Sequence, residues 1–488
     1  MRRTVRLAAV LGLAGMAVSG VTACQLASSA APTWYPCQGN GLDPRQECAT
    51  LSVPLDYDKP DGERISIAVS RIRSAHPEHR RGVLFLVPGG PGSGGLGLPS
   101  TWGARLPESV RDEYDLIGFD PRGLGASVEA NCHVPKEDLV LERLRPWPDA
   151  DGGIAGNVEV ENRVAAACIR NGGALVRSIG TRTEARDIDR IRESLGENKI
   201  AAWGQSYGTY VVSVYATMFA DRTDRVLLDS NDDPDPDLIE RGWAANYAVA
   251  MEDRFPDFAR WASSDGNPDR VAETPDAVRE EFLTVAARLD RAPLPWPGAE
   301  LSALSGNGLR QTMLDGLHSD KQFPFLAQLL NAAAGSGTLP AAPPAAPEQT
   351  VQRSTAVLIA TLCNDVAWPT SVGDYTAAVA ADRARFPLTA GMPRGYSPCA
   401  TWPYPVAPRT LVNSSGPSNV LLVQNLRDPA SPYSGALNLR RAFGDRARMV
   451  AVDAGGHGAY PSPVACANEA VERFLRDGTR PETDLTCR

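Results

Sequence analysis

The stretch AAWGQSYGTYVV, residues 201–212, decides the fold. Its first part is a short apolar run typical of a buried strand, and its last part has the composition of a buried helix. Between them, residues 204–208 match G-x-S-x-G, the pattern of a serine on a sharp strand-to-helix turn. The glycines flank the serine because a Cβ would collide with neighbouring segments in so tight a turn. The stretch therefore predicts an exposed nucleophile, Ser206.

Strand and helix patterns alternate on both sides of this turn. A helix is expected at 183–196, with Thr181 and Glu184 as a capping box at its start. A second helix follows Ser206. Strands are expected at 63–74, 82–87, 114–120, 199–206 and 224–231. This alternation predicts an α/β fold with a mostly parallel central sheet covered by helices.

The second half of the chain interrupts this core and then completes it. A mostly helical segment runs from about 232 to 405 and contains a Pro/Ala tract at 339–349, which is expected to be a loop. Strand patterns return at 418–428 and 447–456, followed by a helix at 468–478. The predicted organisation is a leader at 24–50, a first core part at 51–231, a helical cap insertion at 232–405 and a core completion at 406–488.

The first 23 residues have the pattern of a signal peptide. A short cationic segment precedes an apolar run that is too short for a comfortable membrane span. The run ends in Val21-Thr22-Ala23-Cys24, which resembles a bacterial lipobox with Cys24 as the lipidated residue. Cleavage near Ala31 is the alternative. The first reading predicts a lipoprotein anchored to the outer face of a membrane, and the second predicts a secreted protein.

The cysteines support export to an oxidising compartment. Nine are present, and eight remain if Cys24 carries lipid, which is an even number. Eight cysteines allow 105 pairings. Order along the chain suggests the pairs Cys37–Cys48, Cys132–Cys168, Cys363–Cys399 and Cys466–Cys487.

Charge and motifs narrow the range of partners and cofactors. The formal net charge is −9 and no basic stripe is present, so nucleic acid is not an expected partner. CxxC and HExxH motifs are also missing from the sequence. We therefore expect neither a metal nor another cofactor.

The base for Ser206 should be one of five histidines. A serine hydroxyl is a poor nucleophile until a base takes its proton. His457 lies between glycines in AGGHGAY, directly after an expected core strand, so its ring can project from a loop. The other histidines lie in less suitable places: His76 and His79 in a charged turn, His133 beside Cys132, and His318 in the insertion.

The carboxylate that orients this histidine is expected to be Asp428. It ends an expected strand, and α/β folds place their sites at the carboxyl ends of strands. The chain order Ser206, Asp428, His457 is that of α/β-hydrolases. The 222 residues between serine and aspartate fit a cap inserted into the core. Asp229, Asp365 and Asp453 are competing candidates.

A tetrahedral intermediate also needs donors for its oxyanion. The backbone N–H of Tyr207 should be one, and Gly90 in PGGPGSGG (88–95) should be the second. The glycine loop could instead be a plain turn or cradle a phosphate. No Gly-Lys-Ser/Thr follows it, which disfavours a P-loop.

Together these motifs resemble one family. The segments are VPGGPGSGG (87–95), GFDPRGLGAS (118–127), WGQSYGTY (203–210), RDPASPYSGA (427–436) and GGHGAY (455–460), with CNDVAWP (363–369) and CATWP (399–403). Over residues 45–488 they are similar to the secreted tripeptidyl aminopeptidases of actinobacteria, relatives of proline iminopeptidase. The resemblance implies an α/β-hydrolase with a helical cap, and it carries Ser206, Asp428, His457 and Gly90 over as site residues.

The resemblance also implies an activity, removal of short peptides from free N-termini by a serine exopeptidase. The cap of such an enzyme should hold acidic residues that bind the substrate amine. Asp232, Asp233, Glu240 and Glu252 are candidates, each of which could instead belong to a solvated acidic surface. An esterase with the same triad is the alternative enzyme, since both reactions pass through an oxyanion. A surface lipoprotein that binds peptides without turnover is the non-enzymatic alternative.

Overall fold

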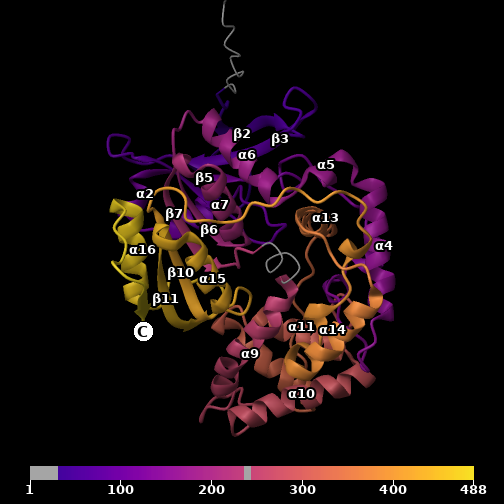
Figure 1. The fold of residues 1–488 in the computed structure, drawn as a ribbon. Coiled ribbons are helices and arrows are strands. Elements are labelled where there is room, and N and C mark those ends of the chain that lie inside the picture. Colours follow the sequence, from indigo (N-terminus) through magenta and orange to yellow (C-terminus); the bar gives the residue numbers. More distant parts are fainter. Residues whose placement is uncertain (1–30, 236–242) are drawn as a thin grey trace, which may run out of the picture.

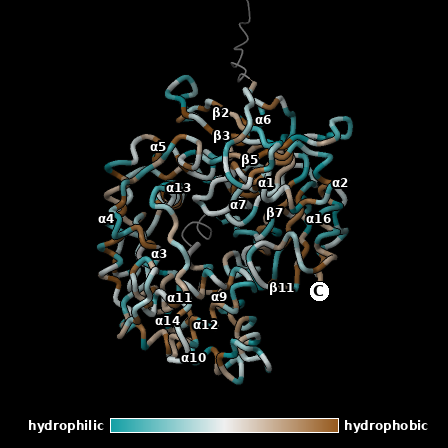
Figure 2. The backbone as a smooth tube through the Cα atoms, turned by 180° about the vertical axis from the view of Figure 1, so that it is seen from behind, coloured by the Kyte–Doolittle hydropathy of each residue, from teal (hydrophilic) through white to brown (hydrophobic). Residues whose placement is uncertain are grey.

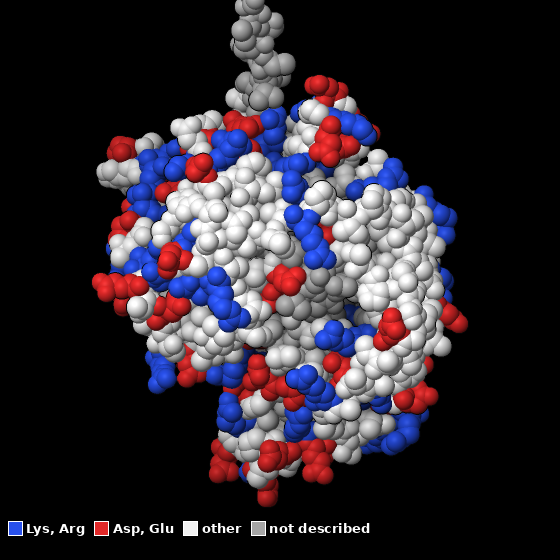
Figure 3. All heavy atoms as spheres, in the orientation of Figure 1, with Lys and Arg blue, Asp and Glu red and all other residues white. Residues whose placement is uncertain are grey.

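The computed structural model describes residues 31–235 and 243–488. The expected signal peptide at 1–23, Cys24 and Glu240 lie outside the described residues. Within the described part, every helix is too short or too polar to span a bilayer. Charged side chains of both signs are interspersed over the face drawn in Figure 3.

A large twisted sheet forms the core, as expected (Figure 1). Strands β5, β4, β6, β7, β10, β11 and β12 run parallel, and β1 to β3 join antiparallel at one edge. In sheet order the strands are β1 (Tyr35–Pro36), β2 (Glu47–Pro54), β3 (Arg64–Ile72), β5 (Tyr114–Phe119), β4 (Gly82–Val87), β6 (Ile200–Ser206), β7 (Thr223–Asn231), β10 (Val420–Arg427), β11 (Ala447–Gly455) and β12 (Leu485–Cys487). A separate two-stranded ribbon is formed by β8 (Leu294–Pro295) and β9 (Ala303–Leu304).

Helices cover both faces of the sheet, because the central strands are apolar on both sides. One face packs on α6 (Thr181–Ser194), α7 (Tyr207–Met218) and α15 (Tyr433–Phe443). The other face packs on α1 (Leu98–Thr101), α2 (Glu108–Arg111) and α16 (Ala465–Asp477). The strand β4, with sequence GVLFLV, is buried along its whole length. This sandwich confirms the expected α/β fold.

Further helices lie beyond the carboxyl ends of the parallel strands and form an arc beside the sheet (Figures 1 and 2). One apolar cluster is built mainly by α9 (Trp243–Ala262), α10 (Pro275–Arg291), α11 (Gly306–Gly316) and α12 (Phe323–Ala334). A second is built by α4 (Ala155–Asn171), α5 (Gly173–Ser178) and α13 (Glu348–Asp365). Two further helices, α3 (Leu141–Leu144) and α14 (Val372–Arg385), complete the arc. The arc therefore combines the insertion with helices that precede α6.

Four disulfides join the cysteines in the order that the sequence suggests. Cys37–Cys48 ties the N-terminal segment to β2, and Cys466–Cys487 ties α16 to β12. The other two, 132–168 and 363–399, lie in the apolar cluster around α4 and α13.

One local expectation is wrong. The expected capping box does not form, because Thr181 is the first residue of α6 rather than its cap. Both its N–H and its hydroxyl donate to Asp365, at 3.0 and 2.6 Å, so a distant carboxylate caps this helix. The N-terminal leader contributes to the sheet, since residues 47–50 begin β2 and pair along β3.

Candidate active site

Ser206 occupies the turn between β6 and α7, with φ 57° and ψ −131°. A positive φ is rare for a residue with a side chain and marks a strained backbone. The flanking glycines permit this turn for steric reasons. A Cβ on Gly204 would lie 2.4 Å from the carbonyl oxygen of Gly208, and a Cβ on Gly208 would lie 2.4 Å from that of Val87. The structure thus gives the expected reason for each glycine.

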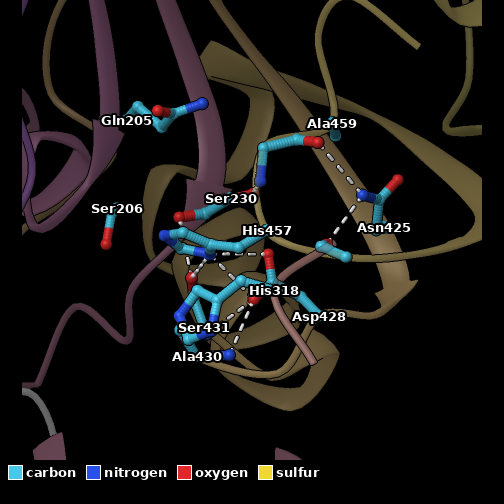
Figure 4. A network of polar contacts seen from close by, with 12 residues as sticks. Gln205, Ser206, Ser230, His318, Asn425, Asp428, Ala430, Ser431, His457 and Ala459 are labelled. Carbon is cyan, nitrogen blue, oxygen red and sulfur yellow. Dashed lines mark hydrogen bonds and ion pairs between the residues drawn. The ribbon is translucent and has the colours of Figure 1, made fainter. Parts of the chain in front are cut away.

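His457 and Asp428 form a close pair at the carboxyl ends of β11 and β10. Nδ1 of His457 lies 2.9 Å from Oδ1 and 3.1 Å from Oδ2 of Asp428. The backbone N–H groups of Ala430 and Ser431 also donate to Asp428 Oδ1, each at 2.9 Å. In Figure 4 the His457 ring lies between Asp428 and Ser206. The three residues expected to form a triad are thus brought to one edge of the sheet.

Charge and burial set the protonation of this pair. Burial alone would raise the pKa of Asp428, but the charge and hydrogen bond of His457, together with the two backbone N–H donors, hold that pKa below 3.8. Burial likewise opposes the charged form of His457, but Asp428, with smaller contributions from Asp232 and Asp229, raises the pKa of His457 above 6.5. The pair is therefore suited to stabilise an imidazolium.

The loop that carries His457 is held by the end of β7. The hydroxyl of Ser230 accepts the N–H of Gly458 at 2.8 Å, and Oδ1 of Asp229 accepts the N–H of Ala459 at 2.7 Å. Burial raises the pKa of Asp229 to about 6, against hydrogen bonds that lower it. Ser230 itself has φ 57°. These contacts fix the loop, and sequence reasoning assigned neither residue this role.

His318 lies against His457, which the sequence analysis did not anticipate. The two rings meet edge to face with centroids 5.3 Å apart (Figure 4). Nδ1 of His318 lies 3.0 Å from the carbonyl oxygen of Asp315, so this nitrogen carries the proton and donates. Burial, together with the charge of His457, lowers the pKa of His318. His318 is therefore held neutral next to the expected base.

The glycine loop contacts the serine through Gly89. A Cβ on Gly89 would lie 2.8 Å from Cβ of Ser206. Gly90 is the next residue, with φ 121°, and Tyr207 begins α7, where backbone N–H groups have no partner within the helix. The oxyanion roles of Gly90 and Tyr207 stay predictions.

The residues considered for amine binding differ in burial and in their ion-pair partners. Asp232 and Asp233 are each only 5% exposed, so neither belongs to a solvated surface. Burial raises the pKa of Asp232 to about 7. Glu252 pairs with Arg279 at 2.8 Å. The end of β7 thus places two buried carboxyl groups beside the site.

The remaining candidates lie elsewhere. Asp365 caps α6, and Asp453 is exposed and pairs with Arg427 at 2.6 Å. His76 and His79, with Glu78, place one potential metal ligand each within 4.8 Å of one another on an exposed turn. That turn precedes β4, whereas Ser206 ends the neighbouring parallel strand β6. The two groups therefore lie at opposite ends of the strands.

Comparison with known proteins identifies relatives along most of the chain. Residues 386–487, which include Asp428 and His457, match the family described as TAP-like protein. Tripeptidyl aminopeptidase of Streptomyces lividans is 29% identical over 474 residues, covering 94% of this chain and 87% of the relative. Serine protease Hip1 of Mycobacterium tuberculosis is 27% identical, covering 93% of this chain and 90% of the relative. Carboxylesterase B of the same species is 29% identical, covering 90% and 86%. An α/β-hydrolase from a deep-sea metagenome overlays with a TM-score of 0.37 at 10% identity, covering 86% of this chain and 98% of that chain.

The fold and the site define an α/β-hydrolase of the serine hydrolase class, in which a serine on a strand-to-helix turn lies beside a histidine–aspartate pair. Within this class, the chain is similar along most of its length to tripeptidyl aminopeptidases, and residues 386–487 match the TAP-like protein family. It is a serine hydrolase.

Proposed function

We propose that this protein is an aminopeptidase that releases short peptides, tripeptides above all, from free N-termini through an acyl-enzyme. One observation supports this more than any other, the His457–Asp428 pair beside a strained Ser206. The names of the relatives, a tripeptidyl aminopeptidase and a serine protease, support the choice of a peptide substrate.

In the proposed reaction Ser206 attacks the scissile carbonyl while His457 takes its proton. Asp428 holds the imidazole in one tautomer and stabilises the imidazolium. His457 then protonates the leaving amine, and the C-terminal part of the peptide departs. Water, activated by the same histidine, releases the N-terminal fragment and restores Ser206.

The oxyanion is stabilised by two backbone groups in this proposal. The N–H of Tyr207 lies at the start of α7, directly after Ser206, and the N–H of Gly90 follows the residue that packs on Ser206. Such donors act on charge that develops only in the transition state, so each contributes about 2.7–4 kcal/mol to the lowered barrier. No metal or cofactor takes part in this reaction scheme.

An esterase is the second candidate, favoured by the likeness to a protein named carboxylesterase B. The triad chemistry is the same for esters and amides, so it cannot separate the two substrates. What distinguishes an aminopeptidase is recognition of a free amine by the residues around the triad.

We place the enzyme outside the cytoplasm, secreted or anchored to the outer face of a membrane through Cys24. The four disulfides support an oxidising compartment. Mass measurement of the mature N-terminus tests the anchor. A diacylglyceryl group on Cys24 supports it, and a free N-terminus near Ala31 contradicts it.

The activity is tested by hydrolysis of a tripeptide-coumarin amide with a free N-terminus. The N-acetylated amide, a proline amide and a short-chain nitrophenyl ester run beside it, each with Ser206→Ala as the control. Turnover of the free tripeptide amide, lost in the variant, supports the aminopeptidase. Turnover of the ester alone contradicts the peptidase and favours the esterase.

A further inference from the structure

Four aspartates gather at the carboxyl ends of β7 and β10, and three of them have hydrogen-bond donors on their carboxylates. Asp229 accepts from Gln205 and Ala459, Asp233 from Asp235 and Asn438, and Asp428 from His457, Ala430 and Ser431. Asp232 differs from these neighbours: its Oδ2 is buried and has no hydrogen-bond partner in the described part of the chain. A buried carboxylate oxygen without a donor is costly and rare.

The position of Asp232 is fixed next to the expected nucleophile. Ser206 pairs with Asn231 across β6 and β7, and Asp232 is the next residue. Its backbone N–H donates to the hydroxyl of Thr209 at 3.0 Å, and that hydroxyl donates to the carbonyl oxygen of Ser206. Strand spacing and rise then place the Cα of Asp232 roughly 6 Å from that of Ser206.

The surroundings of Asp232 would stabilise a cation bound to its carboxylate. Burial is the largest influence on its carboxyl group, and the nearby carboxylates of Asp428 and Asp233 also disfavour its charge. The partial compensation comes from His457, whose own hydrogen bond goes to Asp428. An incoming positive charge would therefore find an acceptor, Oδ2, that no donor from the described residues occupies.

We propose that Asp232 binds the free α-ammonium group of the peptide substrate and so makes this site an exopeptidase site. This inference rests on the proposed aminopeptidase function. An ammonium offers three N–H donors and a full charge, which together satisfy a buried carboxylate. An N-acetylated peptide offers a neutral amide instead and leaves the carboxylate uncompensated. Discrimination between the two substrates follows from that difference.

Asp233 supplies a matched control, because it follows Asp232 in the chain, is equally buried, and already has two donors. The test compares Asp232→Asn, Asp232→Glu and Asp233→Asn with the natural enzyme. Each is assayed for kcat and KM on a tripeptide-coumarin amide and on its N-acetylated form, with thermal unfolding as a check of folding. Asparagine keeps the shape of the side chain and removes the charge, and glutamate keeps the charge.

We expect Asp232→Asn to lower kcat/KM for the free tripeptide about 10- to 100-fold, chiefly through KM, since hydrogen bonds to charged groups have that strength. Turnover of the acetylated substrate should change little, so the preference for a free amine collapses. Asp232→Glu should keep more of that preference than Asp232→Asn, and Asp233→Asn should keep all of it.

The outcomes separate this inference from the function on which it rests. A natural enzyme with no preference for free over acetylated peptides overturns the aminopeptidase proposal itself. A natural enzyme that prefers free amines while Asp232→Asn retains that preference overturns the role of Asp232 alone. Equal losses on both substrates in Asp232→Asn also overturn it, because they show that the residue acts on His457 rather than on the substrate amine.

Discussion

The backbone N–H of His457 donates to the carbonyl oxygen of His318 at 3.0 Å. His457 lies on the loop after β11, and His318 follows α11 in the inserted helices. The same carbonyl oxygen would be 3.0 Å from a Cβ on Gly456. The expected base is therefore held by both parts of the chain, and a shift of the inserted helices would move it.

The ring of His318 should matter for turnover. His318→Ala keeps the backbone hydrogen bond to His457 and removes the edge-to-face contact. Such aromatic pairs are worth about 0.5–1.5 kcal/mol, so we expect kcat to fall by up to about tenfold. Steady-state kinetics measure the change, with His133→Ala on an exposed residue as the control. An unchanged kcat would contradict a positioning role for the ring.

Gly89 should tolerate no side chain. A Cβ there would meet Cβ of Ser206 at 2.8 Å and the carbonyl oxygen of Gln205 at 3.1 Å, so Gly89→Ala must displace the serine. We expect kcat/KM to fall at least about 100-fold, the usual effect of a misplaced reacting group. Gly97→Ala is the matched control, since its nearest atom would be Leu42 Cδ2 at 3.8 Å. Equal activity of the two variants would show that the loop does not position Ser206.

The acid limb of the pH profile should depend on Asp428. His457 must be neutral to act as a base, and its raised pKa places the loss of activity on acidification above pH 6.5. In Asp428→Asn the largest influence that opposes burial of His457 is lost, so the residual activity should persist to lower pH while kcat falls about 10⁴-fold. Profiles of kcat/KM for both forms measure the shift. An acid limb that stays in place would mean that another group controls it.

The same pair should also make stability depend on pH. The lowered pKa of Asp428 contributes stability that is present above pH 3.8 and is lost as the pH falls through its folded value. The raised pKa of His457 contributes stability that is present below pH 6.5 and is lost as the pH rises through its folded value. The Tm difference between the natural enzyme and Asp428→Asn should therefore be largest between these two limits. A constant difference from pH 3 to 9 would refute this linkage.

Arg122 should be essential for stability rather than for chemistry. Its guanidinium binds Asp187 with both Nε and Nη2, at 2.7 and 2.6 Å, and the two side chains are 2% and 1% exposed. Arg122→Met leaves a buried carboxylate without its charged partner, which should cost about 3–5 kcal/mol of unfolding free energy. Denaturant unfolding measures this cost.

The exposed pair of Arg45 and Asp43 is the control for that experiment, because its 2.7 Å contact lies at the surface. Arg45→Met should cost less than about 1 kcal/mol. Similar costs for the two substitutions would show that burial of the Arg122–Asp187 pair has little effect.

Much of the core could be predicted because its patterns are local. The apolar run at 82–87 and the turn at Ser206 depend on residues that are adjacent in the chain, and the structure has β4 and the β6–α7 turn there. Asp428 and His457 could be placed at strand ends for the same reason. The fold class was within reach from these segments alone.

What could not be predicted depends on contacts between distant segments. The burial of Asp232 follows from packing against segments far along the chain, so its acidity suggested a solvated residue. Asp365 reaches α6 from 184 residues away and replaces a local capping box. The nearness of His318 to His457 likewise requires the arrangement of the inserted helices. One signal was available, since the residues directly after a parallel strand face the ligand edge of such a sheet.

The position of the insertion also affects how the chain folds. β10 pairs with β7 although 188 residues separate Asn231 from Val420, and closing so long a loop costs about 4–5 kcal/mol of chain entropy. The sheet is therefore completed late, by segments that leave the ribosome after the insertion. Asp428 and His457 both lie in those segments, whereas Ser206 precedes the insertion. A nascent or truncated chain thus holds the serine without its partners, and hydrolysis begins only when the whole polypeptide has folded.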